Sequence, residues 1–185
     1  MTKVLGISGS LRRGSYNSAL LRAAARLMPA DATLEIASIR GIPLYDGDVE
    51  AQGIPAAVAQ LKDAVASADG VLLVTPEYNN SIPGVFKNAI DWLSRPPADV
   101  KRVFTGRPFA VIGASPGMFG TTLSQAAWLP VLRTLGTHPW FGGRVAVARA
   151  ASVFDESGNL KDAAVEEQLK QFLAGYVAFV RRSGR

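Results

Sequence analysis

The segment from Ser8 to Ser18 combines hydroxyl groups, glycine and positive charge in a way that suits a bound anion. It lies between a short apolar run and an amphipathic stretch, so it is predicted to join a strand to a helix. In such a connection, backbone N–H groups, the helix dipole and arginine side chains can converge on one anion. We therefore expect a phosphate site here. The alternative, a capping turn rich in serine and glycine, leaves Arg12 and Arg13 without a role.

Two familiar phosphate-binding motifs come close to this segment, and both fail. Gly9 and Gly14 have the spacing of a Walker A loop, but Ser15-Tyr16 replaces the Lys-Ser/Thr pair that holds the γ-phosphate and magnesium. The dinucleotide fingerprint G-x-G-x-x-G is absent, and no acidic residue ends the second predicted strand to bind a ribose. The sequence thus disfavours an NTPase and a dinucleotide as the resident cofactor.

Two further loops are expected at the same edge of the predicted sheet. The segment Thr75 to Gly84 is stiffened by prolines and carries polar groups and one aromatic ring, so it can present backbone amides to a flat heterocycle. The segment Gly113 to Thr121 is rich in glycine, which permits close backbone approach, and Thr121 or Thr122 is expected to cap the helix that follows. Each segment taken alone is equally compatible with an ordinary turn before a helix.

The elements that must position these loops follow from a repeated pattern of a short apolar run and then an amphipathic stretch. This alternation predicts parallel strands joined by crossover helices. The predicted strands are Lys3 to Ile7, Thr33 to Ala37, Gly70 to Thr75, Pro108 to Ala114 and Arg144 to Ala148. The predicted helices are Asn17 to Met28, Pro55 to Ser67, Gly84 to Leu93, Thr122 to Leu135 and Asp162 to Arg182. In such a sheet, ligands bind outside the carboxyl ends of the strands, where the three loops would meet.

The bulk composition excludes several kinds of protein. With 48% hydrophobic and 19% charged residues, the chain is neither disordered nor built around a membrane span. It has no cysteine, which rules out disulfides, cysteine-based zinc sites and thiol nucleophiles. The formal charge of +5 comes from scattered lysines and arginines, so we expect attraction for small anions rather than nucleic acid. The apolar run within residues 1–7 is too short for a signal peptide, and Gly6 interrupts it. We therefore expect a cytoplasmic protein.

Together, the three loops resemble the NADPH-dependent FMN reductase family, which includes quinone, azo-dye and chromate reductases. The resemblance extends from about Lys3 to the final helix. The motifs that carry it are Gly9-Ser10-x-Arg12-x-x-Ser15-x-Asn17, Pro76-Glu77-Tyr78-Asn79-x-Ser81-x-Pro83-Gly84 and Lys87-Asn88-x-x-Asp91-Trp92. It implies a single flavodoxin-like domain over residues 1–185, with a doubly wound α/β fold. Its parallel sheet would have five strands in the order 2-1-3-4-5, covered by helices on both faces.

The resemblance also implies which residues hold FMN. Its phosphate would be bound by Ser10, Arg12, Ser15, Asn17 and Ser18. The isoalloxazine ring would be lined, largely through the main chain, by Pro76, Glu77, Tyr78 and Asn79, with Ser115 and Gly117 on its other side. Met118 stands where family members often carry a second glycine, which leaves the shape of the acceptor side open.

The implied activity is transfer of electrons from NADPH or NADH through FMN to a small-molecule acceptor: a quinone, chromate, ferric chelate, azo dye or free flavin. Because the hydride chemistry belongs to the flavin, no catalytic side chain and no metal are expected. The only histidine, His138, is expected to be structural. The alternative is a flavodoxin-type electron carrier, although those proteins are usually acidic. Dimers or tetramers are also implied, and apolar residues of two helices were candidates for the interface: Val85, Phe86, Ile90, Trp92, Leu93, Trp128 and Leu129.

Overall fold

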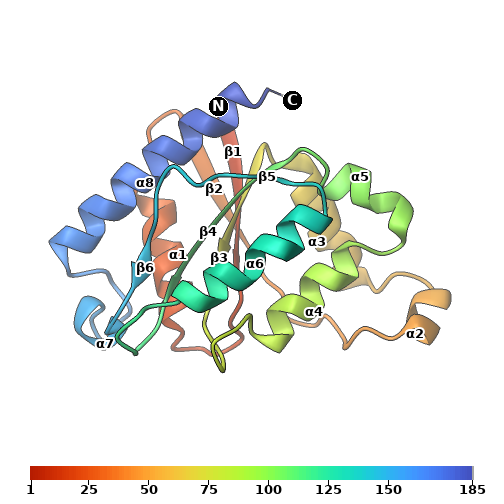
Figure 1. Ribbon diagram of the computed structural model, residues 1–185, viewed down its shortest axis with the longest axis horizontal. Helices are drawn as coiled ribbons and strands as arrows, with labels where there is room; N and C mark the ends of the chain where they lie inside the picture. Colours follow the sequence, from red (N-terminus) through yellow and green to blue (C-terminus); the bar gives the residue numbers. More distant parts are fainter. Residues whose placement is uncertain (185) are drawn as a thin grey trace.

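The computed structural model describes residues 1–184 and contains one parallel β-sheet with helices on both faces (Figure 1). Its strands run in the spatial order β2-β1-β3-β4-β5, with β6 also paired to β4, which confirms the predicted order. The strands are β1 (Thr2–Ser8), β2 (Ala32–Ala37), β3 (Gly70–Val74), β4 (Pro108–Ala114), β5 (His138–Pro139) and β6 (Ala146–Val147). The main helices are α1 (Tyr16–Arg26), α3 (Ala56–Ser67), α4 (Gly84–Leu93), α6 (Thr122–Thr134) and α8 (Ala163–Arg182).

Shorter helical segments, none of them predicted, lie in the connections. They are α2 (Gly47–Ala51), the 3-10 helix η1 (Pro97–Asp99), α5 (Val100–Val103) and α7 (Ala150–Val153). Each has five residues or fewer, so none carries enough apolar periodicity to be recognised in a sequence. The five helices that were predicted all form, with ends that differ from the prediction by two residues at most.

The central strand β3 separates two apolar layers. All five of its residues are buried, and they alternate between the faces. Leu72 and Val74 pack with α1 and α8, whereas Val71 and Leu73 pack with α3, α4 and α6. A strand covered on both sides is apolar throughout, which is why this segment gave so clear a strand signal.

The fifth strand differs from its prediction. Of the segment Arg144 to Ala148, only Ala146–Val147 pairs with β4, and it contacts the carboxyl end at Gly113 and Ala114. A separate strand that was not predicted, His138–Pro139, pairs with the amino end of β4 at Pro108 and Phe109. Between the two strands the chain passes close to the indole of Trp140. The backbone of Gly142 lies so near this ring that a Cβ there would be 2.6 Å from its Nε1. The edge of the sheet is therefore divided into two short strands.

Most of the apolar residues proposed for a subunit interface lie instead in the core of this chain. Phe86, Ile90, Trp92, Leu93 and Trp128 are each 2% exposed or less. They fill the layer between α4, α6 and the sheet, where Phe86 and Trp128 meet edge to face with ring centroids 5.0 Å apart. Only Val85 and Leu129 of that set are exposed. The expectation that these side chains lie on the surface was therefore wrong for the other five.

Candidate functional site

The carboxyl ends of β1, β3 and β4 bring the three loops together, as Figure 1 shows at the lower edge of the sheet. We call them loop one (residues 9–15), loop two (75–83) and loop three (115–121). A cavity of about 360 Å³ lies between them. Of the residues predicted for the site, it is lined by Ser10, Arg12, Ser15, Asn17, Pro76, Glu77, Tyr78 and Ser115. The lining residues that the sequence interpretation missed are Tyr16, Ala114 and Pro116, each adjacent in the chain to a predicted one.

Loop one places a cation and a helix N-terminus at this cavity. Ser15 is the N-cap of α1, and its Oγ accepts a hydrogen bond from the Ser18 N–H at 3.3 Å. The other N–H groups of this first turn, those of Tyr16 and Asn17, have no partner within the helix, so they are available to an anion. Arg12 lies with its guanidinium carbon 5.7 Å from the centre of the Tyr16 ring and forms no ion pair with residues 1–184. A free cation therefore stands beside a helix N-terminus that has no acidic residue in its first turn.

Two predicted phosphate ligands have other partners. Asn17 is buried, and its side-chain amide makes two hydrogen bonds to the backbone of Ala114. Ser18 Oγ lies 3.1 Å from Ser8 Oγ, and Ser18 lines a neighbouring cavity with Ser10 and part of β2. The geometry therefore leaves Ser10, Arg12 and Ser15 as side-chain donors at the main cavity, while the side-chain amide of Asn17 is occupied by Ala114.

Loop two is a rigid turn. Tyr78 and Ser81 exchange backbone hydrogen bonds of 3.1 and 3.0 Å, and the two residues between them, Asn79 and Asn80, have φ values of 50° and 61°. Asparagine tolerates this left-handed region better than other residues with a side chain, and two such residues in a row form a tight hairpin turn. Asn79 therefore lies in the turn and does not line the cavity, whereas Pro76 and Tyr78 do.

The side chain of Glu77 reaches from loop two to the start of α6. Its Oε2 accepts hydrogen bonds from the N–H groups of Leu123 at 2.8 Å and Ser124 at 3.0 Å. Thr121 occupies the N-cap position but makes no capping hydrogen bond, and the Thr122 hydroxyl donates to the Phe119 carbonyl. The expected capping by Thr121 or Thr122 was thus wrong, because the cap comes from a distant loop.

Loop three is fixed by the segment that follows β6. Arg149, in the left-handed region at φ 48°, donates its N–H to the Gly117 carbonyl at 2.9 Å. The next N–H, of Ala150, donates to the Ser115 carbonyl at 3.0 Å. Gly117 does not line the cavity, and the apex of the loop exposes Met118 (68%) and Phe119 (79%). Loop three therefore has a fixed backbone and exposes two apolar side chains at its apex.

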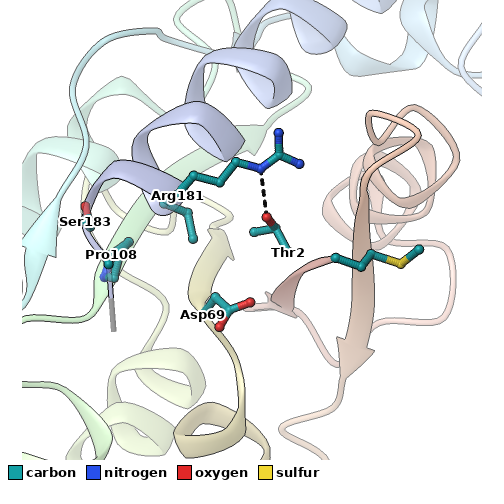
Figure 2. Close-up of a pocket in the computed structure, with 8 residues that line it drawn as sticks. Thr2, Asp69, Pro108, Arg181 and Ser183 are labelled. Atoms are coloured by element: carbon teal, nitrogen blue, oxygen red, sulfur yellow. Dashed lines mark hydrogen bonds between the residues drawn. The ribbon is translucent and has the colours of Figure 1, made fainter.

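A second cavity, of about 210 Å³, lies at the amino ends of the strands, where Met1, Asp69 and Pro108 line it. Figure 2 shows Arg181 there, with its Nε donating to Thr2 Oγ1 at 3.0 Å. The Arg181 guanidinium also forms an ion pair with the carboxylate of Asp31. The hydrogen bond from Arg181 lowers the pKa of Asp31. His138 lies at this same edge, with its ring against Phe179 and far along β4 from the three loops. Among residues 1–184, the guanidinium that lines this cavity, that of Arg181, is thus already paired, unlike that of Arg12.

Within residues 1–184, no group of three or more histidine, aspartate or glutamate side chains is arranged to hold a metal ion. None of the helices in this range has the length and apolar character needed to cross a membrane.

Comparison with known proteins agrees with this architecture. A family model described as NADPH-dependent FMN reductase matches residues 2–152. An NAD(P)H-dependent FMN reductase of Pseudomonas aeruginosa is 47% identical over 180 residues, covering 97% of this chain and 96% of the relative. A 2-hydroxy-1,4-benzoquinone reductase of a Burkholderia species is 38% identical over 179 residues, covering 97% of this chain and 96% of the relative.

Among solved structures, the flavoenzyme FerB of Paracoccus denitrificans, an NAD(P)H:(acceptor) oxidoreductase, superposes with a TM-score of 0.90 at 33% identity, and the match covers 100% of both chains. The sheet order, the three loops at its carboxyl edge and these matches over nearly the whole chain lead to one assignment. The chain belongs to the NADPH-dependent FMN reductase family.

Proposed function

We propose that this chain is an FMN-dependent oxidoreductase that takes electrons from NADPH or NADH and passes them to a quinone. The observation that carries the proposal is the unpaired Arg12 guanidinium beside the N-terminus of α1, in one cavity with the Ser10 and Ser15 hydroxyls. A guanidinium, hydroxyls and helical N–H groups form the donor set that suits a terminal dianionic phosphate. FMN ends in such a group, so these residues fit it.

Loops two and three would hold the ring of the flavin between them. Pro76, Glu77 and Tyr78 of loop two line the cavity together with Ser115 and Pro116 of loop three. Backbone groups in the two fixed loops are suited to orient a flat heterocycle and to exclude water from one of its faces. Neither Asn79 nor Gly117 lines the cavity, so these residues would contribute by shaping their loops.

When bound, FMN supplies the chemistry of accepting a hydride from a nicotinamide and giving two electrons to an acceptor. The residues of the chain then need only to bind, orient and shield it, and no side-chain acid is required. Quinones are the acceptors we propose, because a relative at 38% identity is named as a benzoquinone reductase. Met118 and Phe119, exposed at the apex of loop three, offer apolar surface for such a ring. Chromate, azo dyes, ferric chelates and free flavin are acceptors that the same open face would admit.

A flavodoxin-type electron carrier is the competing function, and one experiment separates the two. We expect the purified protein to show the yellow spectrum of bound flavin, to bleach on anaerobic addition of NADPH, and to recover its colour when a benzoquinone is added. A protein that binds FMN but does not bleach with NADPH or NADH would be a carrier. A colourless protein that does not take up FMN would contradict the proposal altogether.

A further inference from the structure

The hydrogen bonds of Glu77 assign it a role that differs from lining the flavin. The N–H groups of Leu123 and Ser124 are those of the second and third residues of α6, which an N-cap side chain normally satisfies. The residue at the N-cap position, Thr121, is fully buried, and its Oγ1 accepts instead from Gln125 at 3.1 Å. Glu77, which is 46 residues from Leu123 in the sequence, caps α6 in place of Thr121.

A second hydrogen bond fastens loop two to the same helical turn. The hydroxyls of Thr75 and Ser124 lie 2.8 Å apart, and both residues are fully buried. Loop two is thus attached to α6 on both sides of Pro76, by Thr75 and by Glu77. Since α6 begins where loop three ends, these bonds hold loop two at a set distance from loop three, and both loops line the cavity.

The charge of Glu77 is matched by the helix rather than by a basic side chain. Its carboxylate forms no ion pair with residues 1–184, so its nearest positive partner is the N-terminal end of the α6 dipole. A carboxylate held by two N–H groups is oriented toward α6. Its Oε2 is thus engaged by the backbone of α6.

We propose that Glu77 is a positioning residue, which acts on FMN by capping α6 and so fixing loop two against loop three. This inference rests on the proposed function for its effect on FMN, but the cap itself does not. Removing the cap lets the loops separate. Because an N-cap is worth about 0.5–2 kcal/mol, FMN affinity should fall by at most about 30-fold.

The test compares Glu77→Ala and Glu77→Gln with one matched control variant, in which the N-cap of another helix is removed. Asp162 caps α8 in the same way, with Oδ1 accepting from the second and third N–H groups at 2.9 and 3.0 Å, and it does not line the cavity. Asp162→Ala therefore removes an equivalent cap without touching the loops. Hydrogen exchange of the apoprotein, thermal unfolding and FMN titration are measured for each variant.

We expect Glu77→Ala to speed exchange in the first turn of α6 and to weaken FMN binding by about 5- to 30-fold. Asp162→Ala should lower the unfolding temperature by a similar amount but leave FMN affinity within about threefold. Glu77→Gln keeps an acceptor oxygen, so it should restore FMN affinity to within about threefold and be reduced by NADPH at near the parent rate.

Three results would overturn the assignment. They are unchanged exchange of the α6 first turn in Glu77→Ala, unchanged FMN affinity in that variant, or a thousandfold loss of the reduction rate in Glu77→Gln with flavin bound. The last would make Glu77 an acid that acts on the reaction itself. If the parent bound no FMN, the proposed function would fail, while the exchange measurement would still decide whether Glu77 caps α6.

Discussion

Asn17 and Ala114 exchange two hydrogen bonds, in which Asn17 Nδ2 donates to the Ala114 carbonyl at 2.8 Å and the Ala114 N–H donates to Asn17 Oδ1 at 2.9 Å. The last pair between β3 and β4 is Val74 with Ile112, so Ala114 lies just beyond the end of β3. The amide of Asn17 therefore continues the ladder with a side chain where the strand has ended. It joins the first turn of α1 to the start of loop three, and so holds two parts of the site together.

This pairing predicts that Asn17→Ala lowers the free energy of unfolding by about 2–6 kcal/mol, because a buried N–H and a buried C=O both lose their partner at about 1–3 kcal/mol each. Urea denaturation of the apoprotein measures the change. Ser18→Ala is the control, since within residues 1–184 its hydroxyl hydrogen-bonds only to Ser8 Oγ and its removal should cost less than about 1 kcal/mol. Equal stabilities of parent and Asn17→Ala would show that the pairing contributes nothing.

Arg12→Ala should weaken FMN binding by about 10- to 150-fold, because a hydrogen bond to a charged group contributes about 1.5–3 kcal/mol. Arg13→Ala is the matched control: it removes the same charge from the adjacent exposed residue, which does not line the cavity. Flavin fluorescence titrations with FMN, FAD and riboflavin measure the effect. The parent should prefer FMN over both, and riboflavin, which lacks the phosphate, should be insensitive to Arg12. Equal affinities for all three flavins would contradict the phosphate assignment.

Self-association remains a prediction, and it now depends on fewer residues. Val85, Leu123 and Leu129 are 39%, 48% and 45% exposed, and they lie on the adjacent helices α4 and α6. Light scattering at micromolar concentration should give a dimer or tetramer, and Leu129→Lys should shift it toward the monomer, because a charge is costly in an apolar interface. A fully active monomer in the parent protein would end this hypothesis.

The ion pair between buried Lys62 and half-buried Asp99 should make stability depend on pH. Lys62 is 2% exposed, and its Nζ lies 2.8 Å from Asp99 Oδ2, a hydrogen bond that lowers the pKa of Asp99 from its ordinary value of 3.8. A carboxyl whose pKa is depressed by folding stabilises the protein above its unfolded pKa, and this contribution is lost as the pH falls through the folded value. The free energy of unfolding should therefore decline below about pH 4 in the parent.

Asp99→Asn should remove this part of the decline and cost about 1–3 kcal/mol at neutral pH, since it leaves the Lys62 charge without its carboxylate. Chemical denaturation at several pH values measures both effects. Lys170, whose ion pair with Glu166 is exposed on α8, provides the comparison, and Lys170→Met should change stability by less than about 1 kcal/mol. If Asp99→Asn and the parent showed the same pH dependence, the pair would not be the cause.

The sequence predicted most of the strands and the loops of the site because both depend on local pattern, whereas the strand order followed from the family resemblance. The apolar run Val71–Val74 and the stripe on α8 are visible within one window, and the three loops follow from where such runs end. The partners of Asn17 and Glu77 were not predictable in this way, since they lie 97 and 46 residues distant. Nor was β5, a strand of two residues that ends in proline and offers no alternation to recognise. Burial of Phe86 and Trp128 also depends on how two helices meet.

The divided edge of the sheet has a consequence for solubility. A long, flat outer strand presents a row of free N–H and C=O groups to which a strand of another molecule can add, and this is a common start of aggregation. Here β5 and β6 have two residues each, and the turn around Trp140 separates them, so neither is long enough to serve as a template. The register leaves Val111 of β4 without a paired residue between them. This edge of the sheet is thus interrupted at the point where an incoming strand would need continuity, which should keep another molecule from adding a strand here.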